Sequence, residues 1–442
     1  MDNSTRYVVG YDLNDLLTQI SYFELNNDDP KTLVSDGENE RLGIPTVLCK
    51  RKKVNQWSFG TEATRLIIND EGAEVNKLLT LALRAGSITI DGEEFNGIDL
   101  LILFMRKSLD LLSVYVAVDQ IESLVISVQK LDREMLAVLE RVAAAIPVER
   151  AKILFLSYSE SVYYYMLHQQ SELWDPECVV FDHDGRNILS YHMRLNHRTT
   201  PIVGMIDERL FTNYPVPEKK AVYEDEEQDS DTDSKTDSEY EEQVEIADKR
   251  LHDMMHDFLM SRPIRSVYLL GTGFDGEWCK KTIGFLCVGR RVFQGRNMYS
   301  KGACYFGMDR RIPTKLNEDY LFLGKDKLQF NLGILMDRGA REEYIALADG
   351  GENWFDIGTE VEFILAGGSK VDLIVTPLDG KAVRTVTIGL DGLPGRPPKT
   401  TRLKMNVGFQ SGSKVKVVIE DLGFGEIFPA TGMKWEQETE IE

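Results

Sequence analysis

The sequence predicts an α/β region followed by an antiparallel β region, and two patterns carry this prediction. Up to about residue 312, short apolar runs typical of strands alternate with helix-like segments, as in strands joined by crossover helices. From about residue 320, polar and apolar residues alternate with period two between Gly, Asp and Pro turns, as in an antiparallel sandwich. At 442 residues the chain exceeds the size of a single core. We therefore expect one domain over 1–312 and a second over 313–442.

The elements of the first domain follow from local composition. Residues 6–63 contain β-branched and aromatic runs separated by the turn sequences NNDD and SDGENE, which predict strands and hairpins. Helices and strands then alternate, and we expect helices at 74–86, 97–115, 133–145 and 160–169, and strands at 124–129 and 152–157. A further helix over 244–260 precedes the strand SVYLL. In the second domain, the expected strands include EVEFILAG, KVDLIVTPLDG, AVRTVTIGL, TRLKMNVGF and KVKVVIEDLG.

An acidic run separates the two halves of the first domain. Residues 224–245 contain twelve carboxylates and one lysine, which supply −11 of the net charge of −21. High charge density without an apolar period predicts a disordered insertion over 219–246. The remaining chain lacks the basic stripe that neutralises phosphates, so we expect no nucleic-acid partner.

Targeting signals and cysteine usage indicate a cytoplasmic protein. The start MDNSTRYVVG lacks an apolar signal core, and the most apolar stretch, 100–118, is interrupted by Arg106, Lys107 and Asp110. We therefore expect no membrane association. The five cysteines form no CxxC pair and are odd in number, which suits reduced thiols.

Three segments carry the strongest indication of function: VVGYDLND at 8–15, VVFDHDGR at 179–186 and VYLLGTGFDG at 267–276. In each, an apolar strand runs into a turn that contains Asp or Gly. Ligands of open α/β sheets bind beyond the carboxyl ends of the strands. We therefore expect Asp12, Asp182 and the turn with Gly271 and Gly273 to converge on one site.

With these segments in this order, the chain resembles the nucleotide-binding domain of the DnaK-type heat-shock chaperones, in the actin and sugar-kinase superfamily, followed by their β-sandwich domain. The resemblance implies an actin-like two-lobed ATPase fold with ATP and Mg²⁺ between the lobes. It also implies a polypeptide client on the sandwich. No counterpart of the family's helical lid is expected, and the sequence does not predict the oligomeric state.

The resemblance also assigns roles to individual residues. Asp12 and Asp182 would hold Mg²⁺ through water, and Glu160 would orient the attacking water. Further residues of the two phosphate loops and the adenosine loop would line the nucleotide: Gly10, Asn14, Asp184, Gly185, Gly271 and Gly273.

Both phosphate loops depart from the family pattern. Asn14 and Asp15 stand where the family has small residues, and Asp184 and Arg186 replace glycines. Glycines in such loops let backbone N–H groups close on anionic oxygens. Three functions therefore stay open: a weak ATPase of the chaperone type, a pseudo-ATPase scaffold for protein interactions, and a haloacid-dehalogenase-type phosphatase. In the last, Asp182 would be the nucleophile and Asp184 the acid, a spacing that VVFDHDGR matches.

Overall fold

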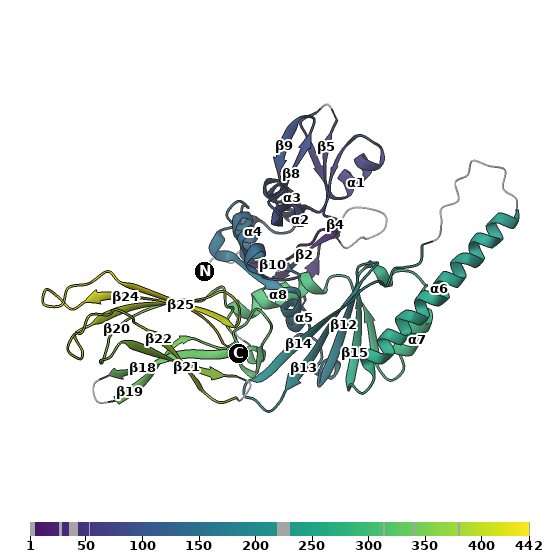
Figure 1. Cartoon of the computed structure of the whole chain (residues 1–442). Coiled ribbons are helices and arrows are strands. Elements are labelled where there is room, and N and C mark those ends of the chain that lie inside the picture. Colours follow the sequence, from purple (N-terminus) through teal and green to yellow (C-terminus); the bar gives the residue numbers. More distant parts are fainter. Residues whose placement is uncertain are drawn as a thin grey trace. The chain divides into compact units, whose positions relative to one another are not determined.

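The computed structural model describes residues 5–25, 29–34, 43–52, 54–218, 230–312, 314–338, 341–378 and 381–441. The chain divides into two compact units, Met1–Tyr320 and Leu321–Glu442 (Figure 1). The first unit is mixed α/β and the second consists of antiparallel strands, as the two sequence patterns predict. The predicted boundary after residue 312 lies eight residues before this division. Strand β17 (Tyr320–Phe322) lies at the division itself.

The first sheet of the first unit is centred on β1 (Tyr7–Asp12). The strand order is β11-β10-β1-β2-β3, and β4 also pairs with β2. The other strands of this sheet are β2 (Leu17–Glu24), β3 (Lys31–Thr32), β4 (Ile44–Pro45), β10 (Ile121–Val128) and β11 (Ile153–Ser157). β1 is antiparallel to β2 and parallel to β10, which in turn is parallel to β11. The sheet is therefore mixed, with β1 buried along almost its whole length.

The second sheet is centred on β12 (Glu177–His183). It contains the strand order β16-β15-β12-β13-β14. The other strands of this series are β13 (Ile188–Asn196), β14 (Ile202–Phe211), β15 (Ile264–Leu270) and β16 (Arg291–Gln294). β12, β13 and β14 form an antiparallel meander, and β12 pairs in parallel with β15, which pairs in parallel with β16.

These two sheets repeat one topology. In each, three antiparallel strands begin at a central strand, and two later strands add in parallel on its other side. β12 therefore corresponds to β1, and β15 corresponds to β10. We call the two halves the first and second lobe, after the sheets around β1 and β12. Asp12 ends β1 and Asp182 is the penultimate residue of β12, so the two carboxylates occupy matching places.

Helices and two small β elements complete the first unit. The helices other than α6 are α1 (Gly60–Ile68), α2 (Leu78–Leu83), α3 (Gly97–Leu112), α4 (Arg133–Ala143), α5 (Tyr158–Leu167), α7 (Lys280–Leu286), α8 (Met298–Arg311) and α9 (Lys315–Asp319), with 3-10 turns at Val118–Gln120, Arg150–Lys152, Ser171–Leu173 and Thr272–Phe274. Asn96, Asp132 and Ser157 accept hydrogen bonds from first-turn amides of α3, α4 and α5, which explains where these helices begin. The small strands are β5 (Leu48–Arg51), β6 (Trp57–Phe59), β7 (Gly72–Val75), β8 (Ser87–Ile90) and β9 (Glu93–Asn96).

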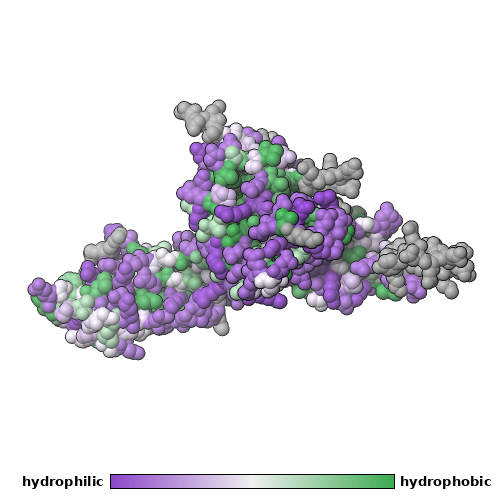
Figure 2. Space-filling model, turned by 90° about the horizontal axis from the view of Figure 1, so that it is seen from above, coloured by the Kyte–Doolittle hydropathy of each residue, from purple (hydrophilic) through white to green (hydrophobic). Residues whose placement is uncertain are grey.

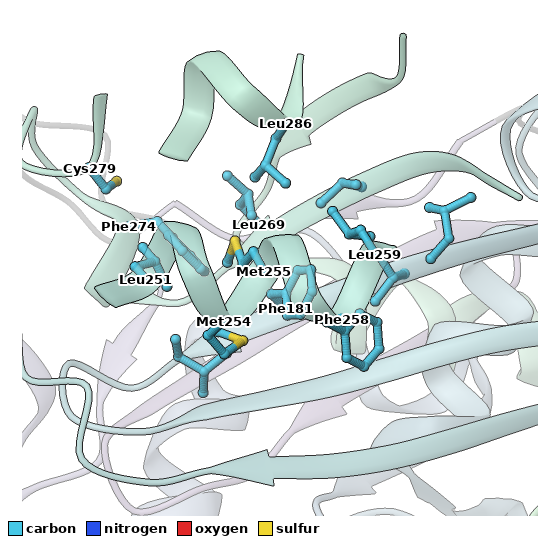
Figure 3. Packing of buried hydrophobic residues seen from close by; sticks show 14 of the residues in the cluster. Phe181, Leu251, Met254, Met255, Phe258, Leu259, Leu269, Phe274, Cys279 and Leu286 are labelled. Carbon is cyan, nitrogen blue, oxygen red and sulfur yellow. The ribbon is translucent and has the colours of Figure 1, made fainter. Parts of the chain in front are cut away.

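A 30-residue helix, α6 (Ser230–Leu259), begins within the acidic run. Its C-terminal half packs Leu251, Met255 and Leu259 against the second sheet and α7, in the cluster drawn in Figure 3. The structure corrects the prediction of disorder for residues 230–246, which are helical. Carboxylates near the N-terminus of a helix stabilise it. Because the C-terminal half of α6 is already held by tertiary packing, the helix can also extend from it toward the N-terminus. Residues 219–229 of the predicted insertion lie outside the described residues.

The described residues of the second unit form two antiparallel sheets. Their orders are β19-β18-β21-β22 and β20-β23-β24-β25. The strands are β18 (Phe330–Arg338), β19 (Arg341–Ala348), β20 (Gly358–Ile364), β21 (Lys370–Pro377), β22 (Arg384–Gly389), β23 (Arg402–Phe409), β24 (Lys414–Gly423) and β25 (Lys434–Glu440). Alternate residues of β24 are buried, so the period-two pattern of the sequence corresponds to one buried and one solvated face. The rings of Phe330 and Phe409 join the two sheets, with centroids 6.2 Å apart.

The surface is largely polar. Figure 2 shows one face on which hydrophilic residues predominate and apolar residues are scattered in small groups. Within the described residues, no helix has both the length and the apolar composition to cross a membrane.

Candidate functional site

Asp12 lies at the carboxyl end of β1 and is only 3% exposed. The hydroxyl of Tyr158 donates a hydrogen bond to Asp12 Oδ1, and Asn14 Nδ2 lies 3.4 Å from the same oxygen. Burial raises the pKa of Asp12 to about 7; the hydrogen bonds from Tyr158 and Asn14 oppose this rise, and the charge of Asp182 adds to it. Asp12 is therefore a buried carboxylate whose hydrogen-bond partners are both neutral.

Asp182 occupies the matching place on β12. The hydroxyl of Tyr299 donates to Asp182 Oδ2 over 2.7 Å. Burial raises the pKa of Asp182, the bond from Tyr299 lowers it, and the charge of Asp184 raises it. The predicted pair of carboxylates is thus close enough for Asp182 to influence Asp12, and each member bonds a tyrosine.

The two tyrosines stack on each other. The ring centroids of Tyr158 and Tyr299 are 3.8 Å apart and their planes differ by 8°. Tyr158 is the first residue of α5, and Tyr299 is the second residue of α8. A continuous set of contacts therefore runs from Asp12 through two stacked rings to Asp182. We call these four residues the carboxylate–tyrosine latch.

The polar side chains of the turn after β1 accept hydrogen bonds from backbone N–H groups of the protein itself. Asn14 Oδ1 accepts hydrogen bonds from the N–H groups of Leu16 and Leu17, both at 2.9 Å. Asp15 accepts from the N–H groups of Leu79 and Thr80, at 2.8 and 3.1 Å, and so holds the first turn of α2. In this turn, the amides of Leu16 and Leu17 are therefore already bonded.

The turn after β12 is arranged in the same way. Asp184 Oδ1 accepts from the N–H groups of Arg186 and Asn187, at 2.7 and 2.6 Å. The N–H of Gly185 donates to His183 Nδ1 over 3.0 Å. Gly185 itself has a φ of +95°, which favours glycine in this turn. Asn14 and Asp184 are thus equivalent turn-forming residues, two positions after equivalent aspartates.

The other predicted glycines are explained by close packing. A Cβ on Gly10 would lie 2.0 Å from the carbonyl oxygen of Ser300 in α8. A Cβ on Gly271 would lie 2.3 Å from the carbonyl oxygen of His183, and one on Gly273 would lie 2.1 Å from the ring of His183. These glycines let α8 and the turn after β15 approach the central strands of the two sheets.

Glu160 lies in the first turn of α5 and is 1% exposed. Burial raises the pKa of Tyr163 and of Tyr164 on the same helix, and the charge of Glu160 adds to both increases. Tyr158, two residues earlier, is the residue of this segment that reaches Asp12. Sequence reasoning missed both latch tyrosines. The strand-to-helix junction at LSYSES is a signal for Tyr158, whereas no local pattern distinguishes Tyr299.

A cleft of about 630 Å³ opens between the two lobes. Leu17, Arg65 and Ile68 line it from the first lobe, and Gly271 and Arg296 from the second. Of the nine predicted site residues, Gly271 reaches this cleft. Among the described residues, no group of three or more His, Cys, Asp and Glu side chains is arranged to hold a metal ion.

Two models of known protein families match the chain. A model described as "Family of unknown function (DUF5716) C-terminal" matches residues 29–325, which is 297 of the 442 residues. The chain belongs to this family. In this DUF5716 protein, the match contains Tyr158, Asp182 and Tyr299 and starts after Asp12. A second model, a domain of unknown function (DUF8552), matches residues 327–441 and so covers almost all of the second unit. No curated protein matches the chain.

Proposed function

We propose that this DUF5716 protein is a pseudo-ATPase scaffold: a divergent DnaK-like, actin-type fold that binds other proteins and does not process ATP. The observation that carries the proposal is the carboxylate–tyrosine latch. Two aspartates stand where the resemblance expects Mg²⁺ ligands, yet each bonds a tyrosine hydroxyl, and the two phenol rings stack at 3.8 Å.

The repeated topology supports the actin-type part of the proposal. Two lobes with the same strand order, each with a carboxylate near the end of its central strand, are what the DnaK resemblance implies. The antiparallel second unit supports the sandwich part, because its two sheets meet through the rings of Phe330 and Phe409. Residues 341–344 of its edge strand β19 are exposed, and such an edge suits an added strand from a polypeptide partner.

ATP with Mg²⁺ does not fit the site as it is built. A triphosphate needs unbonded backbone amides in both loops, and Asn14 and Asp184 each already bond two amides of their own turn. Mg²⁺ needs accessible carboxylate oxygens, whereas Asp12 is buried and the latch tyrosines bond one oxygen each of Asp12 and Asp182. We therefore derive no hydrolysis step for this protein. The bonding of Asp184 within its turn likewise occupies the side chain that the phosphatase interpretation requires as an acid.

Isothermal titration of the full chain with ATP and with ADP, each with and without Mg²⁺, tests the proposal. We expect no Mg²⁺-dependent binding in the wild type or in Asp12→Asn. Mg²⁺-dependent affinity that Asp12→Asn abolishes would overturn the proposal, because it would show a working cleft.

A second measurement tests the scaffold itself. Fluorescence anisotropy of a labelled, permanently unfolded polypeptide, such as reduced carboxymethylated lactalbumin, should report binding that ATP and Mg²⁺ leave unchanged. Nucleotide-dependent release of this probe would contradict a pseudo-ATPase, and lack of binding would contradict an unfolded polypeptide client.

A further inference from the structure

The N-terminal half of α6 is strongly acidic, whereas its C-terminal half borders a groove with more cations than carboxylates. Residues 230–245 contain seven carboxylates and one lysine. Within this half, Glu241, Glu242 and Glu245 are exposed. The C-terminal half borders a groove of about 690 Å³ between α6 and β14, which we call the α6 groove. Its charged lining residues are four cations and two carboxylates: Arg209, Lys249, Arg250, Arg262, Asp253 and Asp257.

The groove's cations lack carboxylate partners in the part of the chain that the structure describes. Three of them lie over aromatic rings: Arg209 over Phe211 at 4.8 Å, Arg250 over Tyr214 at 4.8 Å and Arg262 over Phe258 at 4.5 Å. Stacking holds a guanidinium in place and leaves its N–H donors open to an incoming carboxylate. The two groove carboxylates lie instead against the neighbouring rings of His252 and His256, at 3.2 and 3.4 Å.

This arrangement is unusual for the chain's charge. The protein carries a net charge of −21, yet this groove has four cations against two carboxylates, and three of its arginines lie over aromatic rings. A groove of this kind selects an acidic segment with an apolar contact. The N-terminal half of α6 is acidic, and Ile246, at the middle of the helix, is 61% exposed.

We propose that α6 pairs antiparallel with α6 of a second copy, so that the acidic half of each helix lies along the α6 groove of the other. A twofold axis at Ile246 places Glu242, four residues before it, opposite the partner's Arg250, four residues after it. The same contact then occurs twice, with the two Ile246 side chains at the axis. A closed dimer requires a surface that complements itself, and one helix with an acidic half and a cationic groove meets that requirement.

The helix is long enough for this pairing. Thirty residues at about 1.5 Å per residue give a length of about 45 Å, so each half presents about 22 Å to its counterpart. A carboxylate and a guanidinium from two copies form a charge-assisted hydrogen bond, which is stronger than a neutral one. A different acidic protein would satisfy only the groove and leave the acidic half of α6 without a cationic partner.

Sedimentation velocity of the full chain with a charge-swap design tests the proposal. One variant reverses the groove, Lys249→Glu with Arg250→Glu; the other reverses the acidic half, Glu241→Lys with Glu242→Lys. We expect the wild type to dimerise and each variant alone to dimerise about 100-fold more weakly, because like charges then face each other. An equimolar mixture of the two variants should re-form a dimer, since opposite charges face each other again in the heterodimer.

A matched control changes the charge by the same amount elsewhere. Arg84→Glu with Arg133→Glu alters two exposed arginines away from α6 and should leave dimerisation unchanged. A wild type that stays monomeric up to its solubility limit would overturn the proposal. So would a dimer that survives both reversals, or a mixture that fails to restore it. Thermal melts of each variant show whether a loss of dimer reflects a loss of fold.

Discussion

Two aspartates, one in each unit, are almost equally shielded from solvent, but their pKa values are shifted in opposite directions. Asp12 is 3% exposed and Asp421 is 1% exposed. Burial raises the pKa of both carboxyls, but Arg396 donates two hydrogen bonds to Asp421, at 2.8 and 2.9 Å, and Thr431 donates two more. These contacts hold the pKa of Asp421 well below its ordinary value, whereas the neutral partners of Asp12 leave its pKa raised to about 7. The hydrogen bonds that Asp421 accepts therefore lower its pKa, although its side chain is as little exposed as that of Asp12.

The two carboxylates also differ in whether a cation lies beside them. Asp421 and Arg396 form a complete ion pair inside the second unit. Asp12 ends the central strand of its sheet, and its hydrogen-bond partners, Tyr158 and Asn14, are neutral. The following substitutions test this contrast through the free energy of unfolding.

The largest effect is expected from Arg396→Met, which leaves Asp421 buried without its cation. We expect the second unit to lose about 3–5 kcal/mol of stability. Urea unfolding at pH 7, followed by tryptophan fluorescence, measures the loss. The control is Arg402→Met, which removes an exposed pair with Glu362 at 3.9 Å. A similar cost for both variants would refute the argument from burial.

Asp12→Asn should stabilise the protein at high pH. Because the pKa of Asp12 is raised in the folded state, folded protein holds a proton that unfolded protein releases between about pH 4 and pH 7. Wild-type stability therefore falls as the pH rises through this window. The free energy of unfolding of the variant, relative to that of the wild type, should therefore increase by about 2 kcal/mol from pH 5 to pH 8. Urea midpoints at the two pH values measure this gain, and a gain that does not change with pH would contradict the raised pKa.

The pH dependence of Asp421 should have the opposite sign. Its pKa is lowered in the folded state, so its contribution to stability is present above the ordinary carboxyl pKa of about 4 and is lost as the pH falls. Asp421→Asn should therefore destabilise the protein at pH 7 and matter less as the solution becomes acidic. A destabilisation that grows with acidity would exclude this explanation.

The smallest effect is expected from Tyr158→Phe. The change removes one hydrogen bond to Asp12 and should cost about 1.5 kcal/mol at pH 8. The cost should shrink at pH 5, because the bond from Tyr158 stabilises the charged form of Asp12. Tyr305→Phe is the control, since it removes a phenol bond of 2.7 Å to Asp29 outside the latch. If the two variants respond alike to pH, the latch has no special electrostatics.

Much of the fold was predictable because its signals are local. The predicted helices at 97–115 and 133–145 correspond to α3 and α4, and the predicted strand at 152–157 corresponds to β11. Asn96 and Asp132 supply caps that can be recognised in the sequence itself. The acidic part of α6 was not predictable in this way, because packing of Leu251 and Met255 far along the helix supports its formation.

The candidate site was predictable only in its strand ends. The sequence by itself determined that apolar strands end at or next to Asp12 and Asp182, because the change from apolar to turn residues occurs over consecutive positions. Only the tertiary structure decided what those carboxylates meet: Tyr158 is 146 positions from Asp12, and Tyr299 is 117 positions from Asp182. Burial and hydrogen bonding between such distant residues depend on how the two sheets and α8 pack. The raised pKa of Asp12 is therefore a property of the folded chain and not of any segment.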